Sequence, residues 1–292
     1  MPQEQIDKRK KIRIASILAK KERGEKISML TAYDFYTAKL LDQAGVDMLL
    51  VGDSAAMVIH GHKNTLPITT ETMLDHTSAV TRGCRYALVI ADLPFMSYHI
   101  SKEQAIATSG RFIKEALAEA VKLEGGQRMA ETVRRIVQSG IPVMGHIGLT
   151  PQAVNQLGGY RVQGKSSREA IEILEDARAL EEAGAYSIVL ECVPAPLAAL
   201  ITERLTIPTI GIGAGVHCDG QVQVFHDLLG LFSDFVPKHA RRYANIGDEI
   251  KAAVAEYAGD VQTQAFPTDK ESFTMKQSVL EELAEQTAQQ PA

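Results

Sequence analysis

The stretch MLLVGDS, Met48 to Ser54, begins as a buried β-strand and ends on polar residues. Its first four residues form one apolar run, which is typical of a strand that is covered on both faces. Asp53 and Ser54 follow where the strand leaves the core. A carboxylate at such a position needs a partner, a hydrogen-bonding network or a cation. The stretch therefore indicates a functional site as well as a strand.

The same pattern of apolar run, polar or glycine-rich exit and helical stretch recurs along the chain. It predicts eight strands: KISMLTA from Lys26, DMLLVGD from Asp47, ALVIADLP from Ala87, EAVKLEGG from Glu119, IPVMGHIG from Ile141, YSIVLEC from Tyr186, IPTIGIGAG from Ile207 and SDFVPK from Ser233. Helical segments alternate with them, among them residues 35–45, 101–117, 128–140 and 166–184. This order predicts an α/β fold of the (β/α)8 TIM barrel type, with a doubly wound open sheet as the alternative.

No linker divides the chain before about residue 258, so we expect one barrel domain over residues 1–258. An N-terminal helix is predicted because Ile12, Ile14, Ile17 and Leu18 fall at helical spacing behind a basic cluster at residues 8–13. We interpret that cluster as a solvated helix face, although a nucleic-acid-binding arm is the alternative. Residues 259–292 form a C-terminal tail, partly disordered, with a short amphipathic helix expected at 276–286.

Composition narrows the class of protein. The chain has 292 residues, 45% of them hydrophobic, and a formal net charge of −5, which offers no global attraction to nucleic acid or anionic lipid. Cys84, Cys192 and Cys218 form no CxxC pair, which favours a reduced, cytoplasmic protein. No apolar run approaches the roughly 20 residues that span a bilayer, and the N-terminus lacks the apolar core of a signal peptide. We therefore expect neither a nucleic-acid partner nor a membrane.

Polar residues at the predicted strand ends favour the barrel over the open sheet. These residues are Asp53, Asp92, Lys122, Glu124, His146 and Glu191. The carboxyl ends of barrel strands converge on one face, where the active sites of this fold lie, whereas an open sheet would spread them along a line.

Asp53 and Asp92 suit magnesium, which prefers oxygen ligands and keeps several waters, although each could instead cap the following loop. Lys122 and Glu124 are two residues apart and project to the same side of their strand. The lysine could hold a substrate carboxylate or an enolate oxygen, and Glu124 could order water on the metal or fix the lysine. A structural salt bridge is the alternative for this pair.

Glu191 follows an apolar run, and burial there would suit it to act as a general base. His146 could act in the site or be satisfied by a backbone carbonyl. Cys192 is expected to point away from Glu191 and to pack in the core. Magnesium beside a base suits deprotonation next to the carbonyl of a 2-oxo acid, since the metal stabilises the enolate that forms.

Two further stretches have weaker signals. GIGAG, residues 211–215, could cradle a phosphate, but we prefer a close approach of a ligand or lid to the glycine backbone. Residues 61–67 are interpreted as a mobile covering loop. The nearby His60, His62 and His76 lack the HxxxH spacing of a helical zinc site.

Several long motifs, in this order, resemble the ketopantoate hydroxymethyltransferase family from about Lys26 to Tyr257. They include TAYD (31–34), LLVGDS (49–54), GH..TLPIT (61–69), ADLPFMSY (91–98), VKLEGG (121–126), GHIGLTPQ.VN..GGY.VQG (145–164), LECVP (190–194) and IPTIGIGAG (207–215). The resemblance implies a barrel of the phosphoenolpyruvate mutase and isocitrate lyase superfamily. It also implies transfer of a hydroxymethyl group from 5,10-methylenetetrahydrofolate to 3-methyl-2-oxobutanoate, which gives 2-dehydropantoate for pantothenate synthesis.

The resemblance further implies roles for single residues. Asp53 and Asp92 match the magnesium ligands, with Glu124 counted in the metal group, and Ser54 and Lys122 match the groups that hold the oxo acid. Glu191 matches the base that removes the C3 proton, and Glu124 and His146 match supporting positions. A homo-oligomer, a decamer in the family, is implied as well. The rival interpretations are a carbon-carbon lyase or mutase of the same superfamily, although the chain lacks a KKCGH loop, and a non-catalytic sensor of a small acid.

Overall fold

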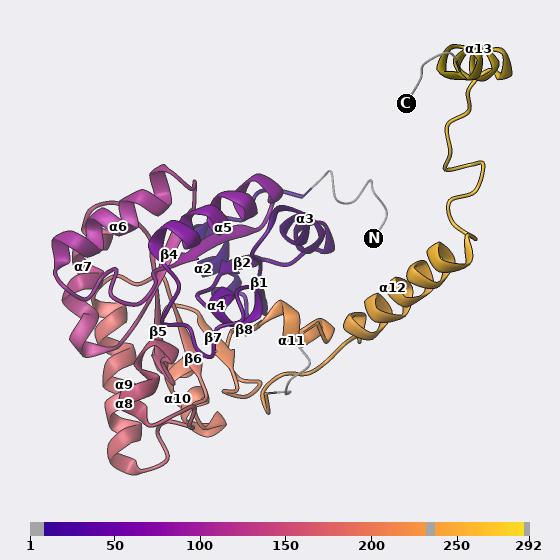
Figure 1. Cartoon of the computed structure of the whole chain (residues 1–292). Coiled ribbons are helices and arrows are strands. Elements are labelled where there is room, and N and C mark those ends of the chain that lie inside the picture. The colour runs from indigo at the N-terminus through magenta and orange to yellow at the C-terminus, as the bar shows by residue number, and fades with distance from the viewer. Residues whose placement is uncertain (1–8, 232–236, 289–292) are drawn as a thin grey trace. The chain divides into compact units, whose positions relative to one another are not determined.

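The computed structural model describes residues 9–231 and 237–288. Eight parallel strands form a closed barrel in sequence order (Figure 1). They are β1 (Ile27–Thr31), β2 (Met48–Val51), β3 (Leu88–Asp92), β4 (Ala120–Glu124), β5 (Val143–Gly148), β6 (Ser187–Glu191), β7 (Thr209–Ile212) and β8 (Gly220–Gln223). The TIM barrel prediction is confirmed, because β1 pairs with β8 and leaves no open sheet edge.

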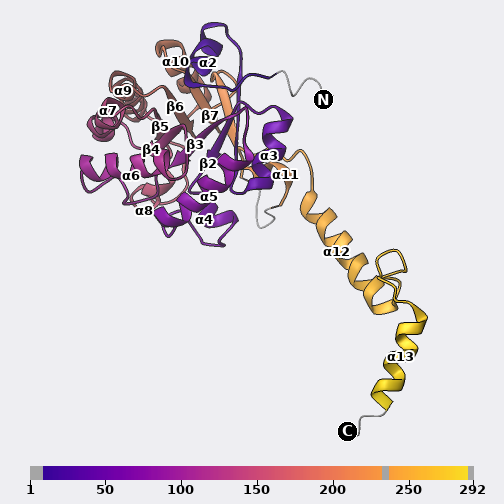
Figure 2. The ribbon, with the colours of Figure 1, turned by 90° about the horizontal axis from the view of Figure 1, so that it is seen from above.

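Helices lie around the outside of the strands (Figure 2). They are α2 (Ile14–Glu22), α3 (Phe35–Ala44), α4 (Ala55–Val58), α5 (Thr70–Gly83), α6 (Lys102–Lys114), α7 (Ala130–Gln138), α8 (Val154–Leu157), α9 (Ser167–Glu182), α10 (Ala195–Arg204) and α11 (Phe225–Leu229). Two short 3-10 turns, η1 (Gln127–Met129) and η2 (Pro151–Ala153), precede α7 and α8. The four helical segments predicted from the sequence correspond to α3, α6, α7 and α9.

The eighth strand differs from the prediction. The strand that closes the barrel is β8, which pairs with β1 at Ile27 and with β7 at Ile210 through Gly220. The predicted segment from Ser233 lies largely on residues 232–236, outside the described residues. The sequence GQVQ of β8 contains a single apolar side chain, and two of its four residues are not buried. This strand therefore lacks the apolar run by which the other strands were found.

Alternation along the strands separates two cores. Met48 and Leu50 of β2 point into the barrel, where they join Ile90, Met144 and Val189, whereas Leu49 packs with the residues that face the helices. Since alternate residues share a face, the inward rows continue to the polar strand ends. The register then places Asp92 beside Lys122, Glu124 beside His146, and Gly148 beside Glu191.

The N-terminal helix α2 packs on the barrel, as predicted. Ile17 is fully buried in the core inside the barrel, and Ile12 and Ile14 pack against the same core. Lys20 Nζ lies 2.6 Å from Asp47 Oδ1, and Lys21 Nζ lies 2.8 Å from Asp219 Oδ2. The described part of the basic cluster, residues 9–13, precedes α2, and Lys11 Nζ lies 2.5 Å from Glu119 Oε2. The interpretation of the cluster as a solvated helix face was therefore wrong.

Residues 245–292 form a second compact unit by themselves. It contains α12 (Ile246–Thr263) and α13 (Gln277–Ala288), neither of which has a buried residue. Helix α12 runs through residue 258, and α13 overlaps the segment 276–286. Over the described ranges, none of the helices has the length and apolar character to cross a membrane.

Candidate active site

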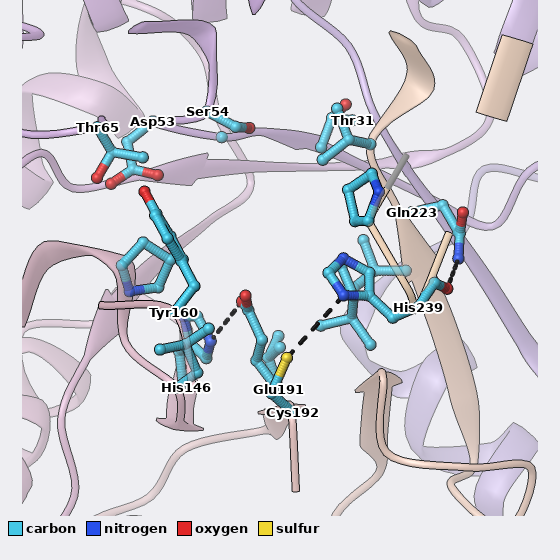
Figure 3. A pocket seen from close by; sticks show the side chains of 18 of the residues that line it. Thr31, Asp53, Ser54, Thr65, His146, Tyr160, Glu191, Cys192, Gln223 and His239 are labelled. Atoms are coloured by element: carbon cyan, nitrogen blue, oxygen red, sulfur yellow. Dashed lines mark hydrogen bonds and ion pairs between the residues drawn. The ribbon is translucent and has the colours of Figure 1, made fainter. Parts of the chain in front are cut away.

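A cavity of about 480 Å³ opens at the carboxyl ends of the strands (Figure 3). All of the site residues named from the sequence line it: Asp53, Ser54, Asp92, Lys122, Glu124, His146 and Glu191. They come from the ends of β2 to β6: most of them continue the inward rows of side chains, whereas Asp53 enters from the turn that follows β2. The fold therefore brings together in one place the residues that the strand-end pattern singled out.

The two aspartates lie next to each other and are almost fully buried. The backbone N–H of Asp53 donates to Asp92 Oδ2 at 3.2 Å, and the two residues are 5% and 1% exposed. Burial raises the pKa of Asp53 well above its usual value, and the charges of Asp92 and Glu124 raise it further. Burial also raises the pKa of Asp92. The site thus holds negative charge that a bound cation would stabilise.

Lys122 faces this acidic group. Its Nζ lies 2.8 Å from Asp92 Oδ1 and 3.9 Å from Glu124 Oε1. Burial alone would lower the pKa of the Lys122 ammonium, but the surrounding carboxylates of Asp92, Glu124 and Asp53 outweigh it and raise the pKa. The lysine therefore remains charged inside the barrel.

His146 joins the lysine to Glu191. Its Nδ1 lies 3.3 Å from both Glu124 Oε1 and Lys122 Nζ, and its Nε2 lies 3.2 Å from Glu191 Oε2. Burial and the nearby lysine would lower the pKa of the imidazole, but the hydrogen bonds that the imidazolium donates to Glu124 and Glu191 raise it to about 9. Both ring nitrogens of His146 thus face charged side chains. Among the described residues, the alternative in which a backbone carbonyl satisfies the ring is not observed.

Ser54 stands on the opposite wall, beside Asp53 (Figure 3). Its Oγ lies 2.8 Å from the hydroxyl of Tyr33. Tyr33 is buried, and it fixes the serine hydroxyl at the edge of the cavity. A polar ligand in the cavity could therefore meet Ser54 on one side and Lys122 on the other.

Gln152, which the strand-end pattern missed, links the acidic residues. Its side-chain Nε2 donates to Asp53 Oδ2 at 3.0 Å and to the carbonyl of Leu93 at 2.9 Å. Its backbone N–H donates to Glu124 Oε2 at 2.9 Å, and its Oε1 accepts from the hydroxyl of Tyr98 at 2.7 Å. It lies in η2, within the motif GLTPQ, and no chemical signal marks it in the sequence.

Other missed residues line the mouth of the cavity. Tyr160 is 52% exposed and directs its hydroxyl toward Asp53 and Thr65 (Figure 3). Thr65 is buried, and its Oγ1 has no hydrogen-bond partner among the described residues. Arg161 and Lys238 add two basic side chains to the lining. These residues lie on loops, where the alternation rule of strands does not apply.

Cys192 corrects an expectation. Strand β6 ends at Glu191, and Cys192 adopts a left-handed backbone conformation with φ of 49°. This turn directs its side chain into the cavity, where Sγ lies 4.0 Å from His239 Nδ1 (Figure 3). The prediction that Cys192 points away from the site was wrong because alternation stops where the strand stops.

The glycines of GIGAG allow a close approach of another segment. Gly213 has φ of 66°, and a Cβ atom on it would lie 3.0 Å from Cβ of His239. The loop that carries His239 therefore packs directly on this turn, whereas the approach of a ligand or lid to GIGAG stays a prediction.

The residues present fit a magnesium ion. In the portion of the chain that the structure describes, no group of three or more His, Cys, Asp or Glu side chains is arranged to hold a metal. Magnesium, however, is usually bound through one or two carboxylates with water and substrate oxygens. Asp53 and Asp92 can supply these, whereas Glu124 uses its oxygens on His146 and on the backbone of Gln152.

Solved structures with the same fold are distant in sequence. A phosphonopyruvate hydrolase in complex with oxalate and Mg²⁺ matches with a TM-score of 0.59 and 12% identity, over 95% of this chain and 97% of its own. A 2,3-dimethylmalate lyase of the phosphoenolpyruvate mutase/isocitrate lyase superfamily matches with a TM-score of 0.56 and 18% identity, over 94% and 98%. These likenesses establish the fold alone.

Sequence comparisons are closer. The 3-methyl-2-oxobutanoate hydroxymethyltransferase of Dehalococcoides mccartyi strain CBDB1 is 58% identical over 270 residues, which are 92% of this chain and 97% of the relative. The enzyme of the same name from Syntrophus aciditrophicus is 57% identical over 266 residues, or 91% and 98%. The model of the ketopantoate hydroxymethyltransferase family matches residues 11–269. The chain therefore belongs to the ketopantoate hydroxymethyltransferase family and is an enzyme.

Proposed function

We propose that this enzyme transfers a hydroxymethyl group from 5,10-methylenetetrahydrofolate to 3-methyl-2-oxobutanoate through an enolate. The C3–H bond of the oxo acid is broken and a carbon-carbon bond forms to the methylene carbon of the donor. Water supplies the hydroxyl oxygen as tetrahydrofolate leaves. The product is 2-dehydropantoate, a precursor of pantothenate. The names of the close relatives support the oxo acid as substrate.

The position of Glu191 is the main support for an enolate mechanism. Glu191 lies in the wall of the cavity, at the end of a row of charged side chains that contact one another. Its Oε2 lies 3.2 Å from His146 Nε2, and His146 in turn contacts Glu124 and Lys122. Glu191 would take the C3 proton, while His146 holds its carboxylate in place. Lys122 and Ser54 would bind the substrate carboxylate and orient C3 toward Glu191.

Magnesium, when bound, would be held by Asp53 and Asp92 and would withdraw electron density from the keto oxygen of the substrate. The raised pKa of Asp53, caused by burial and by the neighbouring carboxylates, supports a cation at this position. A structure with the same fold, that of a phosphonopyruvate hydrolase, was solved in complex with oxalate and Mg²⁺. Glu124 would act beside the metal by fixing His146 and Gln152.

The mouth of the cavity suits the folate donor. Tyr160 offers a half-exposed aromatic ring, which can stack on a flat heterocycle. Arg161 and Lys238 line the same cavity and would meet the carboxylates of the glutamate tail.

Proton NMR of 3-methyl-2-oxobutanoate in deuterated water tests the enolate directly. With enzyme and magnesium but no folate, we expect the C3 proton signal to disappear, and a chelator to prevent the loss. Added 5,10-methylenetetrahydrofolate should then yield 2-dehydropantoate. Absence of this product after folate addition would overturn the proposed reaction.

The variant Glu191→Gln tests the base. Glutamine keeps the shape but accepts no proton, so we expect C3 exchange to fall by about 10²–10⁴-fold while oxo-acid binding is kept. Glu182→Gln, an exposed glutamate paired with Arg178 on α9, is the matched control and should exchange normally. Exchange at the normal rate in Glu191→Gln would remove Glu191 as the base.

The alternative function is a carbon-carbon lyase or mutase, because solved structures with this fold include a 2,3-dimethylmalate lyase. Retro-aldol cleavage of isocitrate or 2-methylisocitrate, without formation of 2-dehydropantoate, would favour it. Because the chain belongs to a family of enzymes, the interpretation as a non-catalytic sensor of a small acid is not favoured.

We further propose a cytoplasmic homo-oligomer. The three cysteines are free thiols, which suits a reducing compartment. Helix α12 half-exposes Ile250, Val254, Tyr257 and Val261 at a spacing of four, three and four residues, so one apolar stripe lies on the helix. Within the same unit, the ring of Tyr257 contacts the ring of Phe266, which covers part of the stripe. A second copy of the chain would bury this stripe. A decamer, as the family resemblance implies, would be one such assembly.

A further inference from the structure

A histidine that follows α4 meets a histidine of α5. His60 Nε2 lies 3.0 Å from His76 Nε2, and the two rings are in edge contact with their centroids 5.3 Å apart. His60 follows α4 and is exposed, whereas His76 belongs to α5 and is half-buried. Neither residue lines the active-site cavity. The pair is therefore separate from the site described above.

His76 is held so that one ring nitrogen is available to a ligand. Its Nδ1 lies 2.7 Å from the carbonyl oxygen of Tyr33. A carbonyl only accepts hydrogen bonds, so Nδ1 carries the hydrogen and Nε2 presents its lone pair toward His60. A backbone carbonyl on the distal nitrogen is the usual means by which proteins fix the orientation of a metal-binding histidine.

The separation of the two Nε2 atoms suits a single metal ion. Zinc–nitrogen bonds of about 2.0–2.1 Å at a tetrahedral angle place two ligand nitrogens about 3.3 Å apart. The observed 3.0 Å is close to this value, and the exposed His60 ring can shift outward. Partial burial and the neighbouring His76 and His62 lower the pKa of His60, which favours the neutral imidazole that a metal requires.

We propose that His60 and His76 form a binding site for one first-row transition-metal ion of the zinc class, with water at the remaining positions. Imidazole nitrogens select such ions over magnesium, which takes oxygen ligands. The ring of His62 stacks on His60 with centroids 6.4 Å apart, so it supports the His60 ring and is not a ligand. The proposal does not depend on the proposed reaction.

Calorimetric titration of zinc chloride into the full-length, magnesium-loaded enzyme tests the site. We expect one zinc-binding event that weakens by more than about tenfold in His60→Gln, because even the loss of an outer partner of a metal ligand costs about 10–100-fold. His62→Gln, a neighbouring exposed histidine, is the matched control and should bind zinc like the wild type. Circular dichroism of both variants establishes that the fold is intact.

Crystals soaked in zinc give an independent readout, since anomalous scattering locates the ion. A peak between the two Nε2 atoms, absent in His60→Gln, is the expected result. An unchanged zinc affinity in His60→Gln would overturn the proposal, as would anomalous peaks confined to the cavity that holds Asp53 and Asp92.

Discussion

At the scale of single residues, the site concentrates buried negative charge. Asp53, Asp92 and Glu124 are at most 5% exposed, and Lys122 and His146 supply the positive charges that face them. Burying charges is unfavourable unless partners compensate for lost hydration. The raised pKa of Asp53 indicates that compensation is incomplete in the metal-free protein. Binding of a cation and folding stability are therefore coupled at this residue.

The variant Asp53→Asn tests this coupling. A carboxyl group with a raised pKa in the folded state binds protons more tightly there, so its contribution to stability is lost as the pH rises through that pKa. At neutral pH and with a chelator, Asn should therefore raise the free energy of unfolding by about 1–3 kcal/mol, the size of one uncompensated buried polar group. Activity with magnesium should be lost. Urea unfolding and the NMR assay measure the two effects.

Asp75→Asn is the matched control, because Asp75 is an exposed aspartate of α5. It should change neither stability nor activity. The stability gain of Asp53→Asn should also shrink as the pH falls toward 4, since the carboxyl of the folded wild type takes up a proton and the buried charge disappears. A metal-free Asp53→Asn protein that is less stable than the wild type at neutral pH would contradict the argument.

At the scale of elements, strand ends were predictable and loops were not. Apolar runs located β1 to β7, and the polar residues at the strand ends then led to Asp53, Asp92, Lys122, Glu124, His146 and Glu191. β8 escaped because GQVQ has no apolar run. Its position follows from closure of the barrel, which is a long-range property.

The missed site residues share one cause. Loops and the 3-10 turn η2 bring three of these residues to the cavity: Gln152, Tyr160 and His239. Cys192 reaches it through a left-handed backbone conformation. No periodicity in the sequence encodes such placements. Family motifs in the sequence contained Gln152, Tyr160 and Cys192, but the motifs by themselves did not assign a contact to any of them.

Gln152→Leu tests whether the 3-10 turn η2 positions Asp53 for the proposed magnesium ion. Leucine fills similar volume but loses both side-chain donations, to Asp53 and to Leu93 O, and the acceptor for Tyr98. We expect magnesium affinity and activity each to fall by about 10–100-fold, as for other outer partners of metal sites. The magnesium dependence of C3 exchange measures both.

Gln138→Leu, at an exposed glutamine of α7, controls for the change of side chain. Saturating magnesium should partly restore exchange in Gln152→Leu, because the ligands themselves remain. A loss that magnesium does not relieve, together with a lowered free energy of unfolding, would show that Gln152 serves the fold and not the metal group.

At the scale of the whole molecule, the two units differ in how far their apolar side chains are buried. The barrel unit buries its apolar side chains in two cores. Helix α12 instead leaves its apolar stripe about half-exposed, with exposed fractions of 46–59%. Helices of a soluble protein are stabilised chiefly by burying such a stripe, so a lone α12 lacks its main source of stability. The family match extends through α12, to residue 269, which makes this helix part of the common enzyme and not an appendage.

Val254→Asp places a charge in the middle of the stripe. If a second copy covers the stripe, the charge should weaken association by about 2–4 kcal/mol, which is about 30- to 1,000-fold in Kd. Sedimentation velocity at micromolar concentration should then reveal smaller species than for the wild type. Ala252→Asp, on the opposite face of α12, adds the same charge and should leave the assembly unchanged. Equal sedimentation of the wild type and Val254→Asp would mean that the stripe is not the interface, and the oligomer proposal would lose its structural support.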